Sequence, residues 1–129
     1  MPPTFRASGR PAPQDVRREA DQRRGSARER GYTSAWDKAA DSHRTRSPLC
    51  IYCEMGAWGD PPRFTPATLV DHLIPHRGDQ DIFWRKSDWI SACKPCHDGP
   101  KQAAEREPYR LRALANAVRA YVTRPRGGL

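Results

Sequence analysis

Apolar residues are scarce in this chain of 129 residues. They make up 36% of the sequence, while charged residues reach 29% and there are 13 prolines and 9 glycines. A domain of this length with so little apolar surface cannot bury a large core. We therefore expect one small domain that needs a disulfide or a metal ion to hold it together.

The sequence also lacks any long hydrophobic run. No stretch approaches the length that crosses a bilayer. The basic segment of residues 1–26 has no apolar region of the kind that secretory signals contain. These absences predict a cytoplasmic protein with no membrane partner. In a reducing compartment, closely spaced cysteines indicate a metal site more often than a disulfide.

Acidic residues are few, 15 against 23 lysines and arginines, which gives a net charge of +8 and a pI near 9.9. A polyanionic partner is favoured, and nucleic acid comes first because Lys and Arg contacts to phosphates supply most non-specific affinity. The alternative is a surplus charge that only keeps the protein soluble. Residues 1–30 are rich in proline and arginine and predict a disordered basic arm, which either follows phosphates or is simply solvated.

Two helices are predicted from capping and periodicity. Thr33 or Ser34 can cap a short helix that carries Trp36 on its core side and ends near residues 44–48. Over residues 108–122, apolar residues recur at the spacing of one buried helical stripe. We predict that residues 107–129 form a C-terminal packing helix and a tail, and that this helix does not read DNA bases.

Two strands are predicted between these helices. Leu69–Ile74 is a short apolar run interrupted by two polar residues, and Pro75 ends its ladder pairing. Trp89–Ala92 is the expected returning strand. The fold class predicted from these elements is α+β.

Four cysteines form two C-x-x-C pairs, Cys50–Cys53 and Cys93–Cys96. Each pair places two thiolates at the right separation for one metal ion, and together they can close a tetrahedral four-cysteine zinc site. The alternative, a thioredoxin-like redox pair, is disfavoured because neither pair lies in a βαβ pattern. A structural zinc ion with four protein ligands has no open position for catalysis, so any chemistry must come from other residues.

The segment between the pairs reads VDHLIPHRG over residues 70–78, and the second pair reads CKPCH over residues 93–97. This combination resembles the HNH endonucleases, in the short phage-type branch with four zinc-binding cysteines. The resemblance covers roughly residues 30–106. It implies a small zinc-stapled ββα-metal domain over residues 31–106, with flanking helices.

The resemblance also implies the roles of individual residues. His72 would be the general base that takes a proton from water, and Asp71 and His97 would hold a catalytic Mg²⁺ or Mn²⁺ ion. The expected reaction is hydrolysis of a DNA phosphodiester bond. Because Asp71 and His72 are neighbours on a predicted strand, their side chains should face opposite sides. The strand must therefore twist, bulge or end there.

Two positions depart from the family pattern. Asp88 stands where the HNH motif has its asparagine, and an ionised aspartate cannot donate a hydrogen bond; we expect reduced or retuned activity. The plainer reading is that Asp88 caps a turn. Gly99-Pro100 should delay the start of the following helix beyond His97, and a lysine follows that histidine by four positions instead of three.

Double-stranded DNA is the partner that the resemblance implies, with phage packaging proteins as a further association by analogy. Phosphate contacts are expected from basic residues of the nuclease domain, each with a plainer reading as a loop or solvated side chain: Arg77, His76, Lys101, Arg85 and Lys86. The main alternative function is a non-catalytic zinc module that binds nucleic acid. An RNA-directed nuclease and a protein-interaction adaptor are further alternatives.

Overall fold

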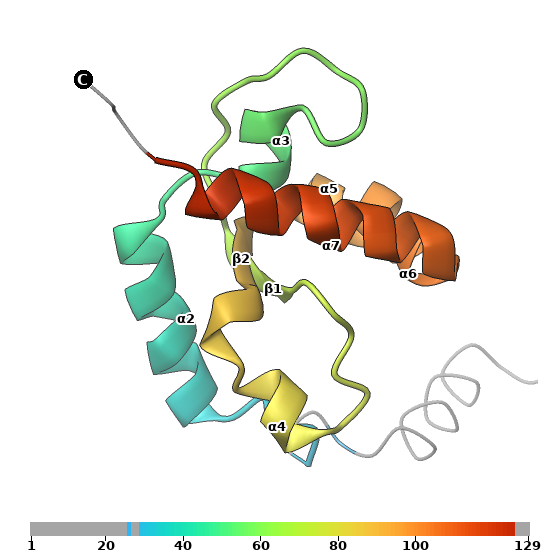
Figure 1. Cartoon of the computed structure of the whole chain (residues 1–129). Helices are drawn as coiled ribbons and strands as arrows, with labels where there is room; N and C mark the ends of the chain where they lie inside the picture. Colours follow the sequence, from blue (N-terminus) through green and yellow to red (C-terminus); the bar gives the residue numbers. More distant parts are fainter. Residues whose placement is uncertain (1–25, 27–28, 126–129) are drawn as a thin grey trace, which may run out of the picture.

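The computed structural model describes Ser26 and residues 29–125. The predicted basic arm, residues 1–30, and the end of the predicted tail therefore lie almost wholly outside the described residues. Within them, helices surround one small sheet, and the protein combines α and β structure with a cluster of four cysteines (Figure 1). None of the helices described is long and apolar enough to cross a membrane.

The sheet has two antiparallel strands, β1 (Leu69–His72) and β2 (Trp89–Ala92). The predicted returning strand is confirmed at both ends, whereas the first strand stops two residues before the predicted Ile74. The chain there approaches Pro75, which has no N–H group to continue a ladder. A two-stranded sheet is not stable in water by itself, so packing on both faces must stabilise it.

One face of the sheet is covered by α2 (Ser34–Arg46), and α4 (Gln80–Phe83) adds Phe83 to the same cluster. A short 3₁₀ turn, η2 (Lys86–Asp88), leads into β2. Thr33 caps α2 as predicted, because its side chain accepts a hydrogen bond from the backbone N–H of Trp36 at 3.4 Å. We call this the aromatic face. Its buried residues are Trp36, Ala40, Val70, Phe83 and Trp89.

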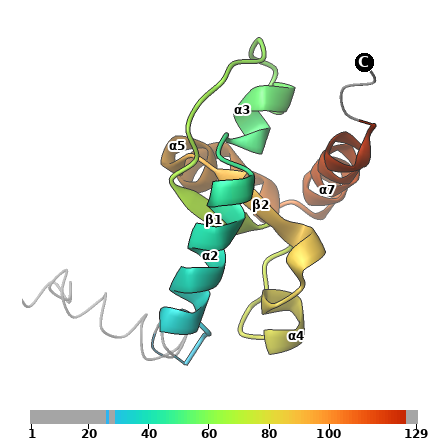
Figure 2. The ribbon, with the colours of Figure 1, turned by 90° about the vertical axis from the view of Figure 1, so that its left-hand side faces the viewer.

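The opposite face is covered by α3 (Ile51–Met55), by the consecutive helical segments α5 (Lys94–Cys96), η3 (His97–Lys101) and α6 (Gln102–Glu105), and by α7 (Pro108–Thr123). Figures 1 and 2 show the sheet between α2 and these segments. We call this the cysteine face. Its buried residues are Cys50, Ile51, Tyr52, Cys53, Leu73, Ile90, Ala92, Cys93, Cys96, Ala104, Leu114, Ala115 and Val118.

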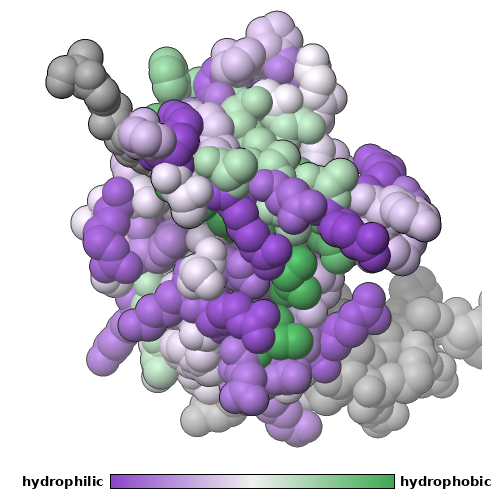
Figure 3. Space-filling model, in the orientation of Figure 1, coloured by the Kyte–Doolittle hydropathy of each residue, from purple (hydrophilic) through white to green (hydrophobic). Residues whose placement is uncertain are grey.

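The last helix packs on this core as its periodicity predicted. Leu114, Ala115 and Val118 are buried, and Tyr121 and Val122 pack against the same cluster. Glu107 caps the helix, since its side chain accepts from the N–H of Tyr109 at 3.1 Å. On the face shown in Figure 3, most residues in the lower half are hydrophilic, and apolar residues are exposed near the middle.

The helix that contains His97 corrects a prediction. Gly99-Pro100 does not delay it: the chain is helical from Lys94 onward, and residues 97–101 form a π-helical turn. A π turn holds one more residue than an α turn, so it accommodates an extra residue without ending the helix. Gly99 lacks the Cβ atom that makes the residue before a proline avoid helical conformation. His97 therefore lies within a helix, not before one.

Candidate active site

The four cysteines form a compact cluster, as their spacing predicted. All four sulfur atoms lie within 4.8 Å of one another, and Cys53 Sγ is 3.9 Å from that of Cys93 and 3.6 Å from that of Cys96. Sulfur atoms about 2.3 Å from one tetrahedral zinc ion are about 3.8 Å apart. All four side chains are buried and none forms a disulfide. The cluster therefore fits a structural zinc ion.

Each cysteine pair begins at the start of a short helix. Cys50 precedes α3 and Cys93 precedes α5, so the two knuckles bring both helices to one point. The indole N–H of Trp58 donates to Cys96 Sγ at 3.2 Å. Hydrogen bonds of this kind orient metal ligands and stabilise thiolates.

An open cleft of about 1130 Å³ runs along β1, and Asp71, His72 and His97 line it. Five consecutive residues, Thr68 to His72, line it, and residues from both faces of the sheet complete it. Because the cleft follows one strand, neighbouring side chains that point to opposite faces can still border the same space. This arrangement answers the geometric question raised by Asp71 and His72: β1 ends at His72, and the cleft borders both.

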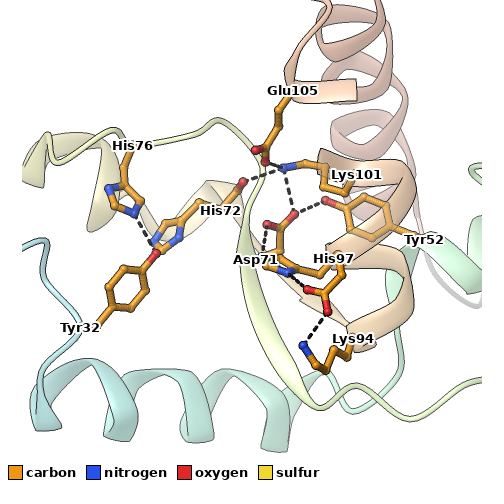
Figure 4. Close-up of polar contacts among 10 residues, drawn as sticks. Tyr32, Tyr52, Asp71, His72, His76, Lys94, His97, Lys101 and Glu105 are labelled. Atoms are coloured by element: carbon orange, nitrogen blue, oxygen red, sulfur yellow. Dashed lines mark hydrogen bonds and ion pairs between the residues drawn. The ribbon is translucent and has the colours of Figure 1, made fainter. Parts of the chain in front are cut away.

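Asp71 is buried on the cysteine face, where it is 3% exposed. Its Oδ2 accepts hydrogen bonds from the hydroxyl of Tyr52 at 2.6 Å and lies 3.0 Å from Nζ of Lys101. Its other oxygen, Oδ1, lies 3.7 Å from Nε2 of His97 (Figure 4). Burial raises the pKa of Asp71, against the opposing effect of the Lys101 ammonium.

His97 is oriented by its neighbour in the chain. Its Nδ1 lies 2.9 Å from Oδ1 of Asp98, and Nζ of Lys94 holds the other oxygen of Asp98. These two hydrogen bonds, that from Lys94 first, lower the pKa of Asp98. The carboxylate of Asp98 can accept from Nδ1–H, and Nε2 faces Asp71. Such a contact at Nδ1 orients a histidine ring so that its Nε2 can bind a metal ion.

The two facing atoms fit a divalent ion. Ligand atoms about 2.1 Å from one Mg²⁺ ion and at a right angle to each other are about 3.0 Å apart. The separation of 3.7 Å between Asp71 Oδ1 and His97 Nε2 needs only a small closure. Two protein ligands are enough for magnesium, which usually keeps water or substrate phosphate in its remaining positions.

His72 lies on the aromatic face and is 7% exposed. Its ring stacks on Trp36, with centroids 4.9 Å apart, and its Nε2 lies 3.1 Å from the backbone carbonyl of Phe83. The indole of Trp89 donates to the same carbonyl at 2.9 Å. A carbonyl only accepts, so Nε2 carries the hydrogen and Nδ1 is left to accept a proton. Burial, and then the nearby His76, lower the pKa of His72 to about 4.

His76 is held in the loop after β1. The backbone N–H of Gly78 donates to its Nδ1 at 3.0 Å, so Nε2 carries the hydrogen and donates to the hydroxyl of Tyr32 at 2.9 Å. Arg77, between His76 and Gly78 in the chain, adopts a left-handed conformation with φ of 49°, which is uncommon for a residue with a side chain. Arg77 is exposed at the cleft, as a phosphate contact requires.

The other predicted phosphate contacts lie elsewhere. Lys101 has no exposed surface, and its ammonium contacts Asp71, Glu105 and the carbonyl of His72 (Figure 4). In this arrangement it is an internal counter-ion and cannot reach a phosphate. Arg85 and Lys86 are exposed, but they do not line the cleft.

Asp88 does not lie in the cleft. It is 3% exposed, and both of its oxygens accept from the guanidinium of Arg119 on α7, at 3.2 to 3.3 Å. Its backbone carbonyl accepts from Leu73 N–H at 2.8 Å, which ties the segment after β1 to the start of β2. The carboxylate of Asp88 is therefore buried and paired with Arg119, away from the cleft. The contacts of its side chain are with Arg119 and Arg85, and none of them is the backbone N–H contact of a turn cap.

Several residues of the site were missed from the sequence. Tyr52 lies between two cysteines, and that position could have marked it as a residue held by the cysteine cluster. Asp98 could have been noticed because it follows a proposed ligand. Glu105 and the carbonyl of Phe83 carry no motif, since their roles depend on tertiary contacts. Trp36 was assigned to the core, which is confirmed, but its stacking on His72 was not predicted.

Comparisons of this chain with protein-family models, with curated proteins and with solved structures find no significant match.

Proposed function

We propose that this protein is a metal-dependent endonuclease that hydrolyses phosphodiester bonds of duplex DNA. The observation that carries the proposal is the meeting of Asp71 Oδ1 and His97 Nε2, 3.7 Å apart, in the same cleft as a neutral His72. A ββα-metal arrangement is part of the proposal, with β1 and β2 followed by the helical segment that carries His97. This matches the HNH resemblance of the sequence.

Asp71 and His97 would hold Mg²⁺ or Mn²⁺. The ion, when bound, supplies positive charge for the phosphate and the leaving oxygen as negative charge develops there. Asp98 keeps Nε2 of His97 free for this role, and Lys101 compensates the charge of Asp71. Lys101 also pairs with Glu105, so its single positive charge offsets that of Asp71 only in part and the carboxylate can still hold a cation.

His72 would remove the proton from the attacking water. Its lowered pKa keeps it neutral at physiological pH, and its hydrogen bond to Phe83 O leaves Nδ1 as the accepting atom. When the proton arrives, the positive charge of the imidazolium is shared with that carbonyl. Trp36 and Phe83 hold the ring in place by contact, with centroids 4.9 and 4.5 Å from that of His72.

Duplex DNA is the proposed substrate because arginines border the cleft. Arg30, Arg44 and Arg77 line it beside the acidic Asp37 and Asp41, and the chain has a net charge of +8. Arg44 pairs with Asp41, so Arg30 and Arg77 are the stronger candidates for phosphate contacts. Arginine contacts to the phosphate backbone position a duplex without reading its sequence. We propose no base-specific contact. An association with phage packaging proteins stays a suggestion of the resemblance.

The test is a nicking assay on supercoiled plasmid with full-length, zinc-bound protein in EDTA, Mg²⁺ or Mn²⁺. We expect nicking only with a divalent ion, and a loss of about 100-fold or more in His72→Ala. The matched control is His43→Ala, because His43 is a half-buried histidine at the end of α2 that does not line the cleft. Equal nicking by both variants would contradict the role of His72.

The second candidate is a zinc module that binds nucleic acid without cutting it. The burial of His72 favours it, because a histidine that is 7% exposed and stacked on Trp36 can serve packing alone. This candidate predicts binding that weakens steeply with salt and no cleavage with any divalent ion. A gel-shift titration on the same plasmid preparation, run beside the nicking assay, separates the two. Including an RNA duplex tests the RNA-directed alternative.

A further inference from the structure

Tyr52 joins the cysteine cluster to the proposed catalytic centre. It is the residue before Cys53 in the first knuckle, and it has no exposed surface. Its ring packs against Trp58 with centroids 5.1 Å apart, and Trp58 in turn donates to Cys96. The side chain is therefore held at its base by the cysteine pair and along its ring by a residue that contacts the second pair.

The hydroxyl of Tyr52 reaches across to Asp71. It donates to Oδ2 at 2.6 Å, and Lys101 approaches the same oxygen at 3.0 Å (Figure 4). Two strong donors on one oxygen leave little capacity there for a further partner. Oδ1, which faces His97, has neither of these donors.

We propose that Tyr52 is a positioning residue for the catalytic ion, because its hydroxyl, fixed by the zinc knuckle, holds Oδ2 of Asp71 and presents Oδ1 to His97. The inference rests on the ion proposed above at Asp71 and His97. It makes the structural zinc site a determinant of affinity at the catalytic site. No zinc ligand needs to touch the substrate for this effect.

The physical reason is preorganisation. A carboxylate without these hydrogen bonds can rotate about its Cβ–Cγ bond, so either oxygen can face His97 and the ion must order the group on binding. When hydrogen bonds hold Oδ2, the carboxylate already has the required orientation in the ion-free protein, so ion binding loses less conformational entropy. Lys101 supplies charge from the π-helical turn, whereas Tyr52 supplies direction from α3.

Tyr52→Phe tests the inference, since it keeps the buried ring and removes only the hydroxyl. In full-length, zinc-bound protein we expect the Kd for Mn²⁺, measured by electron paramagnetic resonance, to rise about tenfold. The Mn²⁺ concentration for half-maximal cleavage should rise by the same factor, with kcat at saturating Mn²⁺ changed less than about twofold. The zinc content should stay at one ion per chain.

Two control variants show how Mn²⁺ binding would change if Tyr52 only stabilised the fold. Tyr109→Phe makes the same chemical change on the exposed side of α7 and should leave the Kd for Mn²⁺ unchanged. Val118→Ala loosens the same core without contacting Asp71, so it reports the effect of lower stability alone. Weakening of Mn²⁺ binding by Val118→Ala equal to that by Tyr52→Phe overturns the inference.

Other outcomes separate this inference from the proposed function. If the wild type binds Mn²⁺ and Asp71→Asn abolishes that binding, but Tyr52→Phe has an unchanged Kd, the inference is wrong and the catalytic centre stands. If the wild type binds no Mn²⁺ besides its zinc, or if Asp71→Asn binds Mn²⁺ as tightly as the wild type, the proposed centre is wrong and the inference falls with it.

Discussion

On the cysteine face of the sheet, the spacing of the two C-x-x-C pairs brings four thiols into one cluster. On the same face, Asp71 is held by a hydrogen bond from Tyr52 and an ion pair with Lys101. On the aromatic face, His72 is held by ring contacts with Trp36 and Phe83 and by one carbonyl. Asp71 and His72 are neighbours in β1, yet hydrogen-bond donors surround Asp71 and aromatic rings surround His72. The first environment suits the proposed metal ligand, and the second suits the proposed base, because burial lowers the pKa of His72.

The largest effect expected from this difference follows zinc removal. Four buried thiols without an ion lose a binding free energy of about 10 kcal/mol or more, so chelation or Cys93→Ser should abolish cooperative unfolding. Because both faces share two short strands, the aromatic face should unfold as well. Zinc content, far-ultraviolet circular dichroism and tryptophan fluorescence measure this. Native fluorescence in zinc-free protein would show that the aromatic face folds independently.

Lys101→Met should have the next largest effect. It removes the counter-ion between Asp71 and Glu105 and leaves their carboxylates uncompensated, which costs about 3–5 kcal/mol for a buried pair. Urea unfolding of zinc-bound protein measures the change. The control is Lys38→Met on the exposed side of α2, which should alter stability little. Equal stability of the two variants would mean that Lys101 does not stabilise the cysteine face.

Arg119→Met should destabilise the protein by about 2 kcal/mol, because Asp88 then remains buried without its main partner. In an Asp88→Asn background the same change should cost less than about 0.5 kcal/mol, since no buried charge is left unpaired. Arg110→Met, exposed on the same helix, is the matched control. If the two substitutions had additive effects on stability, Asp88 and Arg119 would not form the ion pair described above.

The smallest effect expected is a pH dependence from His72. Its pKa is about 4 in the folded state and near 6.5 when unfolded, so the unfolded state binds more protons between these values and stability falls as pH drops below 6.5. Between pH 7.5 and 5.5 the loss should be about 1 kcal/mol relative to His72→Phe, which has no such group. Unfolding of both proteins with zinc bound measures it. Identical pH dependence would show that burial does not depress this pKa.

The sequence predicted the elements that depend on local chemistry. The cysteine spacing predicted the cluster, Thr33 predicted the start of α2, and Trp89–Ala92 was identified as a strand. These features are set by residues close together in the chain. The helix through His97 was predicted wrongly because proline normally breaks an α-helix, and nothing local indicates that a π turn will accommodate it.

What could not be predicted depends on contacts between distant residues. The assignment of Lys101 to a phosphate was reasonable for a helical lysine, but Asp71 and Glu105 meet its ammonium only in the folded chain. The same holds for Asp88, whose partner Arg119 is 31 positions away. Buried charge pairs of this kind have no periodicity that a sequence could reveal.

The most direct test of the central claim, that Asp71 and His72 serve one reaction from opposite faces of β1, is a double-mutant cycle in single-turnover DNA cleavage. Asp71→Asn, His72→Ala and the double variant are compared at one Mn²⁺ concentration that saturates the wild type, with zinc content checked. We expect each single change to slow cleavage at least about 100-fold, and the double variant to be barely slower than the slower of the two single variants. Cleavage that persists in either single variant, or losses that multiply in the double variant, would contradict it.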